Sequence, residues 1–156
     1  MGAILLASCP GLRGHGIAND DDIKTDIETL AAAGAGVILT LLEAGDRVRL
    51  GVTALDEIIA KAGLEGASFP IRDHDIPHSD QSAALGQLLD DLEARIRTGQ
   101  NIAIHCQAGL GRTGMMAAIL LGRFGIDTAA AITAIRQVRP GSIETEAQED
   151  FVRGWG

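Results

Sequence analysis

Short apolar runs alternate with helical patterns along this chain, and that alternation constrains its fold most. A strand buried on both faces of a sheet has a continuous apolar run, whereas a surface helix has apolar residues at every third or fourth position. Strands that alternate with helices favour a mostly parallel α/β sheet flanked by helices. We therefore expect one domain over residues 1–156, with a sheet of about four to five strands. The expected strands are 3–7, 37–41, 67–71 and 102–105.

The expected helices are marked by their ends and by one apolar face. An acidic cluster at 20–22 favours a helix start, and Gly34 ends that segment. Segment 111–124 is apolar nearly all round, which is typical of a helix buried against the sheet. The other expected helices cover 55–62 and 79–99, followed by two final helices. Asp127 should cap the first of these two, with Ile132, Ile135 and Val138 pointing inward. Ser142 should cap the second, which should run through Val152.

Charge and cysteine content exclude several classes of protein. The 156 residues include 13 basic and 21 acidic side chains, a net charge of −8, with one Trp, three Phe and no Tyr, so nucleic acid is not an expected partner. Cys9 and Cys106 lie 97 positions apart without metal-ligand spacing, which favours neither a disulfide framework nor zinc. Residues 1–9 lack the features of a signal peptide, and no window suits a membrane span. We expect no metal, no cofactor, no membrane partner and a reducing, cytoplasmic location.

The segment that leaves the expected strand 102–105 carries the chemistry. Ligands of parallel α/β sheets bind beyond the carboxyl ends of the strands, and here the chain reads His-Cys-Gln-Ala-Gly-Leu-Gly-Arg-Thr-Gly over 105–114. Glycines allow the backbone to curl so that successive N–H groups face an anion, and the following helix points its positive end at the same place. The expected phosphate-binding residues are Gln107, Ala108, Gly109, Leu110, Gly111 and Arg112.

Each side chain of this segment has an expected role. The helix terminus and Arg112 favour a thiolate at Cys106, which makes Cys106 the expected nucleophile. The planar guanidinium of Arg112 can hold two phosphate oxygens at once. Thr113 is expected to donate its hydroxyl to the Cys106 sulfur, and His105 to orient the loop.

Two other interpretations of the segment fit the sequence less well. An isolated Cys is more often a buried apolar filler, but the chance placement of His, Arg and three Gly around one Cys is on the order of 10⁻⁵. A nucleotide-binding loop would need Lys followed by Ser or Thr, whereas Arg112 follows Gly111.

A leaving group would also need an acid. Segment 69–77 leaves a second expected strand and supplies Asp73 and Asp75, either of which could protonate a leaving oxygen and later activate water. Without that location, an Asp in such a segment would be a turn residue.

The pattern His-Cys-x5-Arg-Thr-Gly resembles the signature of the cysteine-dependent protein tyrosine phosphatase superfamily, in its dual-specificity branch. Segments 8–11, 26–30, 109–112 and 139–145 resemble the kinase-associated phosphatase group, also called cyclin-dependent kinase inhibitor 3-like, over nearly the whole chain. The resemblance implies a general acid within a Pro-apolar-x-Asp pattern, which 70–73 matches, so it assigns Asp73, 33 residues before Cys106. It also implies a late Gln that positions the hydrolytic water, which would be Gln148.

These features predict a metal-independent phosphomonoester hydrolase that forms a cysteinyl-phosphate on phosphoprotein substrates. Because the chain has no Tyr for a deep recognition loop, we expect phosphoserine and phosphothreonine to be admitted as well as phosphotyrosine. The alternatives are a phosphoprotein-binding module with weak catalysis, a phosphoinositide phosphatase, which the neutral loop residues disfavour, and arsenate reduction or sulfur transfer. Arsenate reduction would need Cys9 as a resolving thiol, whereas we expect Cys9 to be structural. The sequence leaves the physiological substrate and the oligomeric state open.

Overall fold

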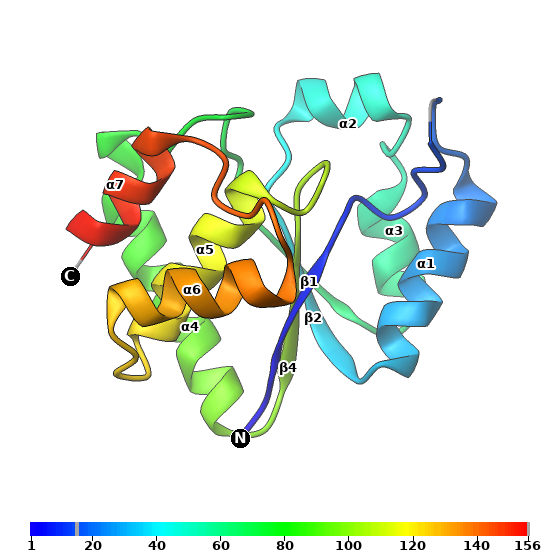
Figure 1. The fold of residues 1–156 in the computed structure, drawn as a ribbon. Helices are drawn as coiled ribbons and strands as arrows, with labels where there is room; N and C mark the ends of the chain where they lie inside the picture. Colours follow the sequence, from blue (N-terminus) through cyan, green and yellow to red (C-terminus); the bar gives the residue numbers. More distant parts are fainter. Residues whose placement is uncertain (15, 156) are drawn as a thin grey trace.

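Four parallel strands form the centre of the molecule. The computed structural model describes residues 1–14 and 16–155, so the predicted domain boundary at 156 lies outside the described residues. The strands are β1 (Ile4–Ala7), β2 (Ala35–Thr40), β3 (Glu65–Ser68) and β4 (Asn101–His105), in the order β1-β4-β2-β3. All three pairings are parallel. The predicted α/β class with a parallel sheet of about four strands is therefore confirmed, and Figure 1 shows β1 as one edge of the sheet.

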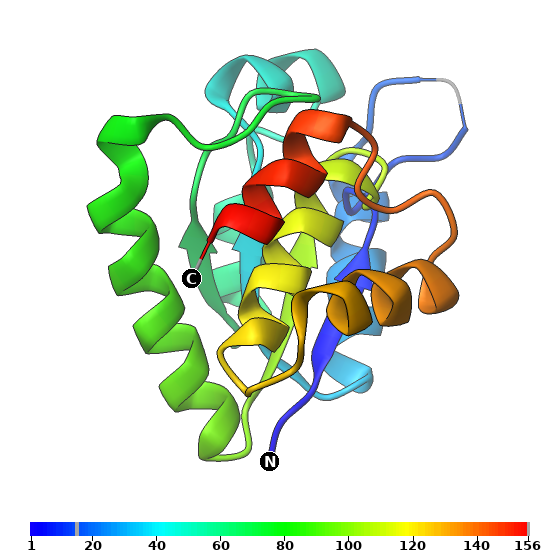
Figure 2. The ribbon, with the colours of Figure 1, turned by 60° about the vertical axis from the view of Figure 1, so that its left-hand side comes forward.

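Helices cover both faces of this sheet. On one side lie α1 (Asp20–Ala32) and α3 (Leu55–Lys61), while α2 (Ala44–Leu50) lies near the carboxyl ends of the strands (Figure 1). On the other side, α5 (Gly111–Gly122) lies among α4 (Ser82–Arg97), α6 (Thr128–Val138) and α7 (Glu146–Gly154), as Figure 2 shows. A short 3-10 helix, η1 (Ser79–Gln81), precedes α4. In the described residues, no helix is both long and apolar enough to span a membrane.

Two apolar clusters, one on each face, hold the sheet between the helix layers. Successive residues of β2 divide between them, because Val37 and Leu39 belong to the cluster with α4 and α5, whereas Ile38 belongs to the cluster with α1 and α3. This is the period of two of a strand buried on both faces. Helix α5 is buried from Gly111 through Leu120, which confirms the prediction made from its apolar composition.

Several local predictions need correction. Helix α2 was not predicted, and β3 ends at Ser68 rather than continuing to residue 71. Ser142 does not cap the last helix, because its side chain donates to the Arg139 carbonyl and Thr145 caps α7 instead. Val138 is 78% exposed rather than inward-pointing, since it is the last residue of α6.

The carboxyl ends of the parallel strands lie at the same end of the sheet, so the segments that follow them enter one region. The Leu41 N–H donates to the carbonyl of His105, and the N–H groups of Phe69 and Ile71 donate to the carbonyls of Thr40 and Leu41. These bonds extend the parallel pairing beyond the regular strands. The segments that follow β2, β3 and β4 consequently start side by side.

Candidate active site

The loop that follows β4 has every carbonyl from residue 106 to residue 110 tied to a group outside it. Cys106 O accepts from His105 Nδ1, Gln107 O from the Cys9 N–H, Ala108 O and Gly109 O from Arg139, and Leu110 O from the N–H groups of Gly114 and Ile143. In a trans peptide the N–H points opposite to the carbonyl, so the N–H groups of 107–111 face the loop interior. Within the described chain, none of them donates to another protein group. The loop therefore presents converging donors, as an anion-binding nest does.

Two glycines of the loop lie where neighbouring segments approach closely. Gly109 has φ of +73°, in the left-handed region, and a Cβ there would collide with the Ala7 carbonyl. A Cβ on Gly111 would collide with Glu144 Oε1 and lie 3.0 Å from Gln148 Oε1. The backbone of β1 and the start of α7 thus press directly against the loop.

Arg112 lies at the first turn of α5 and is 1% exposed. Its Nη1 donates to Asp46 Oδ2 at 2.8 Å and to the carbonyl of Ile71 at 2.9 Å. Nε and Nη2 are buried and make no aligned hydrogen bond with the described residues, although Nη2 lies 3.2 Å from Asp73 Oδ1. Since an unpaired buried guanidinium N–H is costly, this edge of Arg112 is suited to an oxyanion.

Asp46, on α2, forms an ion pair with Arg112 and was not predicted from the sequence. Its Oδ1 accepts from Arg49, which also donates to the side chain of Gln107 at 2.9 Å. Burial opposes ionisation of Asp46, but bonds from Arg112, the Glu43 N–H and Arg49 lower the pKa of its carboxyl below the usual value. A chain of contacts therefore joins α2 to both ends of the loop.

His105 is buried at the end of β4 and stays neutral at physiological pH. Burial is the main cause that lowers the pKa of His105 to about 4. Its Nδ1 lies 3.0 Å from the Cys106 carbonyl, which only accepts, so Nδ1 carries the proton and Nε2 accepts from the Thr40 hydroxyl at 2.8 Å. The ring thus bonds to the loop at the Cys106 carbonyl, and its loop-orienting role stays a prediction.

The two cysteines differ in what surrounds them. Cys106 is a buried free thiol at the start of the loop. Cys9 is also buried as a free thiol, and burial, followed by the charge of Cys106, raises the pKa of Cys9 to about 12. The Cys9 N–H donates to Gln107 O, so its backbone supports the loop while its thiol stays protonated.

The predicted bond from Thr113 to the Cys106 sulfur is not formed. Thr113 is fully buried on α5, but its hydroxyl makes no hydrogen bond with any described residue. The structure thus puts Thr113 near the loop without the contact that the sequence suggested.

The acid segment lies against the loop through Asp73. Asp73 Oδ1 approaches Arg112 and also accepts from the His74 N–H at 3.0 Å, and the side chain is 42% exposed. The Asp75 carboxylate instead accepts from the next N–H, that of Ile76, at 2.8 Å. Of the two candidate carboxyls, Asp73 is therefore the one beside the anion-binding side of Arg112.

Gln148 joins α7 to the acid segment. Its Oε1 accepts from the N–H groups of Glu144 and Thr145, and its Nε2 donates to the Asp75 carbonyl at 3.2 Å. The side chain is fully buried and lies beside Gly111. Gln148 thus lies beside the loop, and its amide joins the two segments around it.

Comparisons with known proteins assign the chain to a family of phosphatase domains. The family model for PTP-SAK, described as a Swiss Army Knife protein, DSP-PTPase phosphatase domain, matches residues 17–152. The chain belongs to this family of dual-specificity-type protein tyrosine phosphatase domains, which confirms the resemblance noted in the sequence.

Particular relatives extend the comparison. Protein tyrosine phosphatase domain-containing protein 1 of Danio rerio is 31% identical over 140 residues, which make up 81% of this chain and 18% of that relative. Cyclin-dependent kinase inhibitor 3 of Homo sapiens is 25% identical over 150 residues, 94% of this chain and 68% of the relative. The chain thus spans about a fifth of the length of the first of these curated relatives and about two thirds of the second.

Solved structures share the fold. A crystal structure of kinase associated phosphatase, with a serine in place of its catalytic site cysteine, has a TM-score of 0.84 at 24% identity, covering 96% of this chain and 83% of that one. Tk-PTP in the active form has a TM-score of 0.76 at 24% identity, covering 98% and 90% of the two chains.

Proposed function

We propose that this chain hydrolyses phosphate monoesters of phosphoproteins without a metal, through a cysteinyl-phosphate on Cys106. The observation that carries the proposal is the loop 106–112. Its five leading carbonyls are turned outward, and Nε and Nη2 of the buried Arg112 guanidinium make no aligned hydrogen bond with the described residues. Such a site fits a dianion that offers several equatorial oxygens. The family and the kinase associated phosphatase relative, which has a catalytic site cysteine, support the same chemistry.

In the first step, the Cys106 thiolate attacks phosphorus and the bond to the leaving oxygen breaks. Asp73 gives that oxygen its proton, and the N–H groups of 107–111 with Arg112 stabilise the charge on the planar phosphoryl group. In the second step, ionised Asp73 takes a proton from water, the water oxygen attacks phosphorus and the sulfur departs, releasing inorganic phosphate. We assign Gln148 to orient this water, because its amide lies beside the loop at Gly111 and is bonded to the acid segment.

The proposed substrates are phosphotyrosine and phosphoserine or phosphothreonine in proteins. The absence of Tyr from the sequence and the relatives named as protein tyrosine phosphatase and cyclin-dependent kinase inhibitor support this class. The free thiols of Cys9 and Cys106 fit a reducing compartment such as the cytoplasm.

The direct test is hydrolysis of p-nitrophenyl phosphate with chelator and reductant present. Wild type should turn over and Cys106→Ser should not, while the variant retains phosphate binding. Turnover by Cys106→Ser, or loss of wild-type turnover on adding chelator, would contradict the proposed chemistry. Phosphate binding by an inactive wild type would instead indicate a phosphoprotein-binding module.

The role of Asp73 is tested against its neighbour. Asp73→Asn should lower kcat strongly for a phenyl phosphate with a poor leaving group and less for p-nitrophenyl phosphate, because only the poor leaving group needs a proton. Asp75→Asn is the matched control, since it removes a carboxylate two residues away that bonds locally. Equal losses for the two substrates in Asp73→Asn, or the same leaving-group effect in Asp75→Asn, would move the acid role away from Asp73.

A further inference from the structure

Arg139 holds the middle of the phosphate loop from outside. It directly follows α6, and its Nε donates to Gly109 O at 2.7 Å while its Nη2 donates to Ala108 O at 2.8 Å. These are two parallel bonds from one planar guanidinium to successive carbonyls, a geometry that Lys cannot reproduce. The other loop carbonyls are tied by His105 or by backbone N–H groups.

The backbone of Arg139 is itself fixed. Its N–H donates to the Ile135 carbonyl at 2.8 Å, and its own carbonyl accepts from both the N–H and the hydroxyl of Ser142. Pro140 and Gly141 complete this turn, with Gly141 at φ of +88°. Ser142, which the sequence suggested as a helix cap, therefore anchors the residue that anchors the loop.

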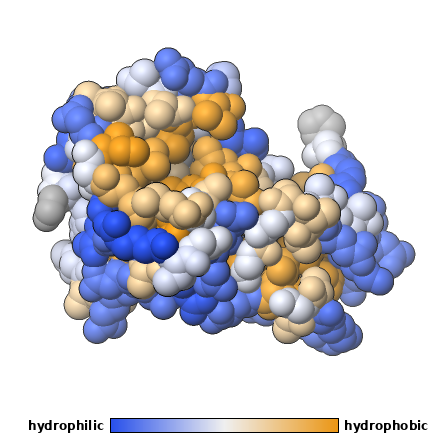
Figure 3. Space-filling model, turned by 90° about the horizontal axis from the view of Figure 1, so that it is seen from below, coloured by the Kyte–Doolittle hydropathy of each residue, from blue (hydrophilic) through white to orange (hydrophobic). Residues whose placement is uncertain are grey.

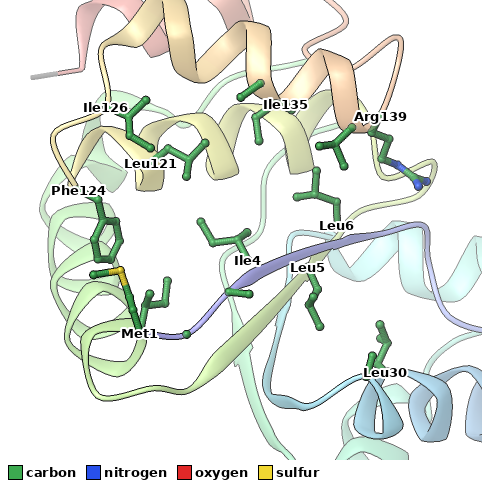
Figure 4. Close-up of a pocket in the computed structure, with 16 residues that line it drawn as sticks. Met1, Ile4, Leu5, Leu6, Leu30, Leu121, Phe124, Ile126, Ile135 and Arg139 are labelled. Atoms are coloured by element: carbon green, nitrogen blue, oxygen red, sulfur yellow. The ribbon is translucent and has the colours of Figure 1, made fainter.

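The side chain of Arg139 borders an apolar cavity of about 660 Å³ between β1, α5 and α6. Figure 4 shows Arg139 at one end of this cavity, near Leu6 and Ile135, with the guanidinium turned away from the apolar side chains. Exposed Met1, Ile126 and Val138 also line it, and Figure 3 shows apolar residues gathered on this lower side of the molecule. The Arg139 side chain thus borders the apolar cavity, while its guanidinium bonds to the loop.

The two carbonyls that Arg139 holds matter for anion binding. In the described chain, Arg139 is the sole group that donates to Ala108 O and Gly109 O. Without it, either peptide could rotate, which would replace an inward N–H with an inward carbonyl oxygen. That oxygen would repel a phosphate oxygen instead of binding it.

We propose that Arg139 is a positioning residue that keeps the 108–109 and 109–110 peptides in their anion-binding orientation. It acts through the loop and touches neither the substrate nor the sulfur. The inference rests on the proposed function in that the bound anion is the substrate's phosphoryl group.

Phosphate affinity separates this role from catalysis. In the Cys106→Ser background, Arg139→Met keeps the apolar side chain along the cavity but removes both donors, and inorganic phosphate should bind about tenfold more weakly, or about 1.4 kcal/mol. Arg153→Met is the matched control, because Arg153 is a surface residue of α7 that pairs with Glu149, and it should bind phosphate as the parent does. Unchanged affinity in Arg139→Met would overturn the inference.

Two further readouts distinguish positioning from general destabilisation. With Cys106 present, Arg139→Met should shift the pH dependence of iodoacetamide alkylation to higher pH, since misdirected carbonyls destabilise the thiolate. Its KM should rise, and thermal unfolding should retain one cooperative transition. A pH profile and KM equal to those of wild type would overturn the inference.

A second variant covers the case in which Arg139→Met does not fold. Arg139→Lys keeps the charge and can bond one carbonyl, so its phosphate affinity should lie between those of the parent and the apolar variant. Full phosphate affinity in Arg139→Lys would contradict the inference that both hydrogen bonds, to Ala108 O and to Gly109 O, are needed. The proposed function fails separately, as an absence of turnover in wild type.

Discussion

Because the unfolded chain takes up a proton at His105 while the folded protein keeps this ring neutral, the free energy of unfolding should fall as the pH drops below about 6.5. Burial lowers the pKa of His105 from 6.5 to about 4, so the unfolded chain binds this proton more readily than the folded one. Stability therefore rises with pH through this window. The contribution is complete above pH 6.5 and is lost as the pH falls towards 4.

The magnitude follows from the two pKa values. The full shift for His105 corresponds to about 3 kcal/mol, of which about 2 kcal/mol should already be lost between pH 7.5 and pH 5. His105 is 1% exposed, so solvent screens the effect little. The other groups whose pKa is lowered are carboxylates, which titrate mainly below about pH 5.

The assay is urea unfolding followed by circular dichroism at pH 7.5, 6 and 5. His105→Gln removes the titrating ring and can still hydrogen-bond, so its unfolding free energy should change much less over this range. Exposed His74 and His78 remain in both proteins and contribute equally. A wild-type unfolding free energy that stays flat from pH 7.5 to 5, or an equal fall in His105→Gln, would refute the account of the buried neutral imidazole.

Three other perturbations test the supports of the loop. Asp46→Asn leaves the buried guanidinium of Arg112 without its carboxylate and should cost about 3 kcal/mol in urea unfolding and lower kcat/KM; a cost below about 1 kcal/mol would contradict the ion pair's role. Gly109→Ala should abolish phosphate binding. Its Cβ would collide with the Ala7 carbonyl, and a non-glycine residue in the left-handed conformation costs about 1 to 2 kcal/mol more. Gly125→Ala shares the positive φ but has nothing within 4 Å of the added Cβ, so it should keep phosphate affinity, and equal losses in both would refute the collision. Cys9→Ser should leave turnover unchanged under reducing conditions, and mass spectrometry should find wild-type Cys9 unalkylated at pH 7.5 while Cys106 reacts.

The layers and the loop could be predicted because their signals are local and redundant. Each apolar run predicts a buried strand by its composition, and α5 predicts its own burial because it has no polar face. Cys106, the glycines and Arg112 lie within one turn between a strand and a helix, so neighbouring residues are enough to indicate a nest there.

The supports of the loop could not be predicted because they come from distant segments. Helix α2 has seven residues, too few for an apolar period, so nothing placed Asp46 behind Arg112, 66 positions away. Arg139 lies within a segment recognised by resemblance, but its carbonyl partners depend on how α6 packs beside the loop. Ser142 was misassigned for the same reason, because a hydroxyl near a helix start satisfies a turn as readily as a cap.

The measurement that tests the central claim most directly is the capture of the intermediate. Wild type mixed with an aryl phosphate, quenched in acid within one turnover and digested for mass spectrometry, should carry phosphate on the peptide that contains Cys106. Asp73→Asn should accumulate less of it with a poor leaving group, and Cys106→Ser should carry none. Steady turnover with no phosphorylated peptide, or with the phosphate on another residue, would contradict the proposal that Cys106 is the nucleophile.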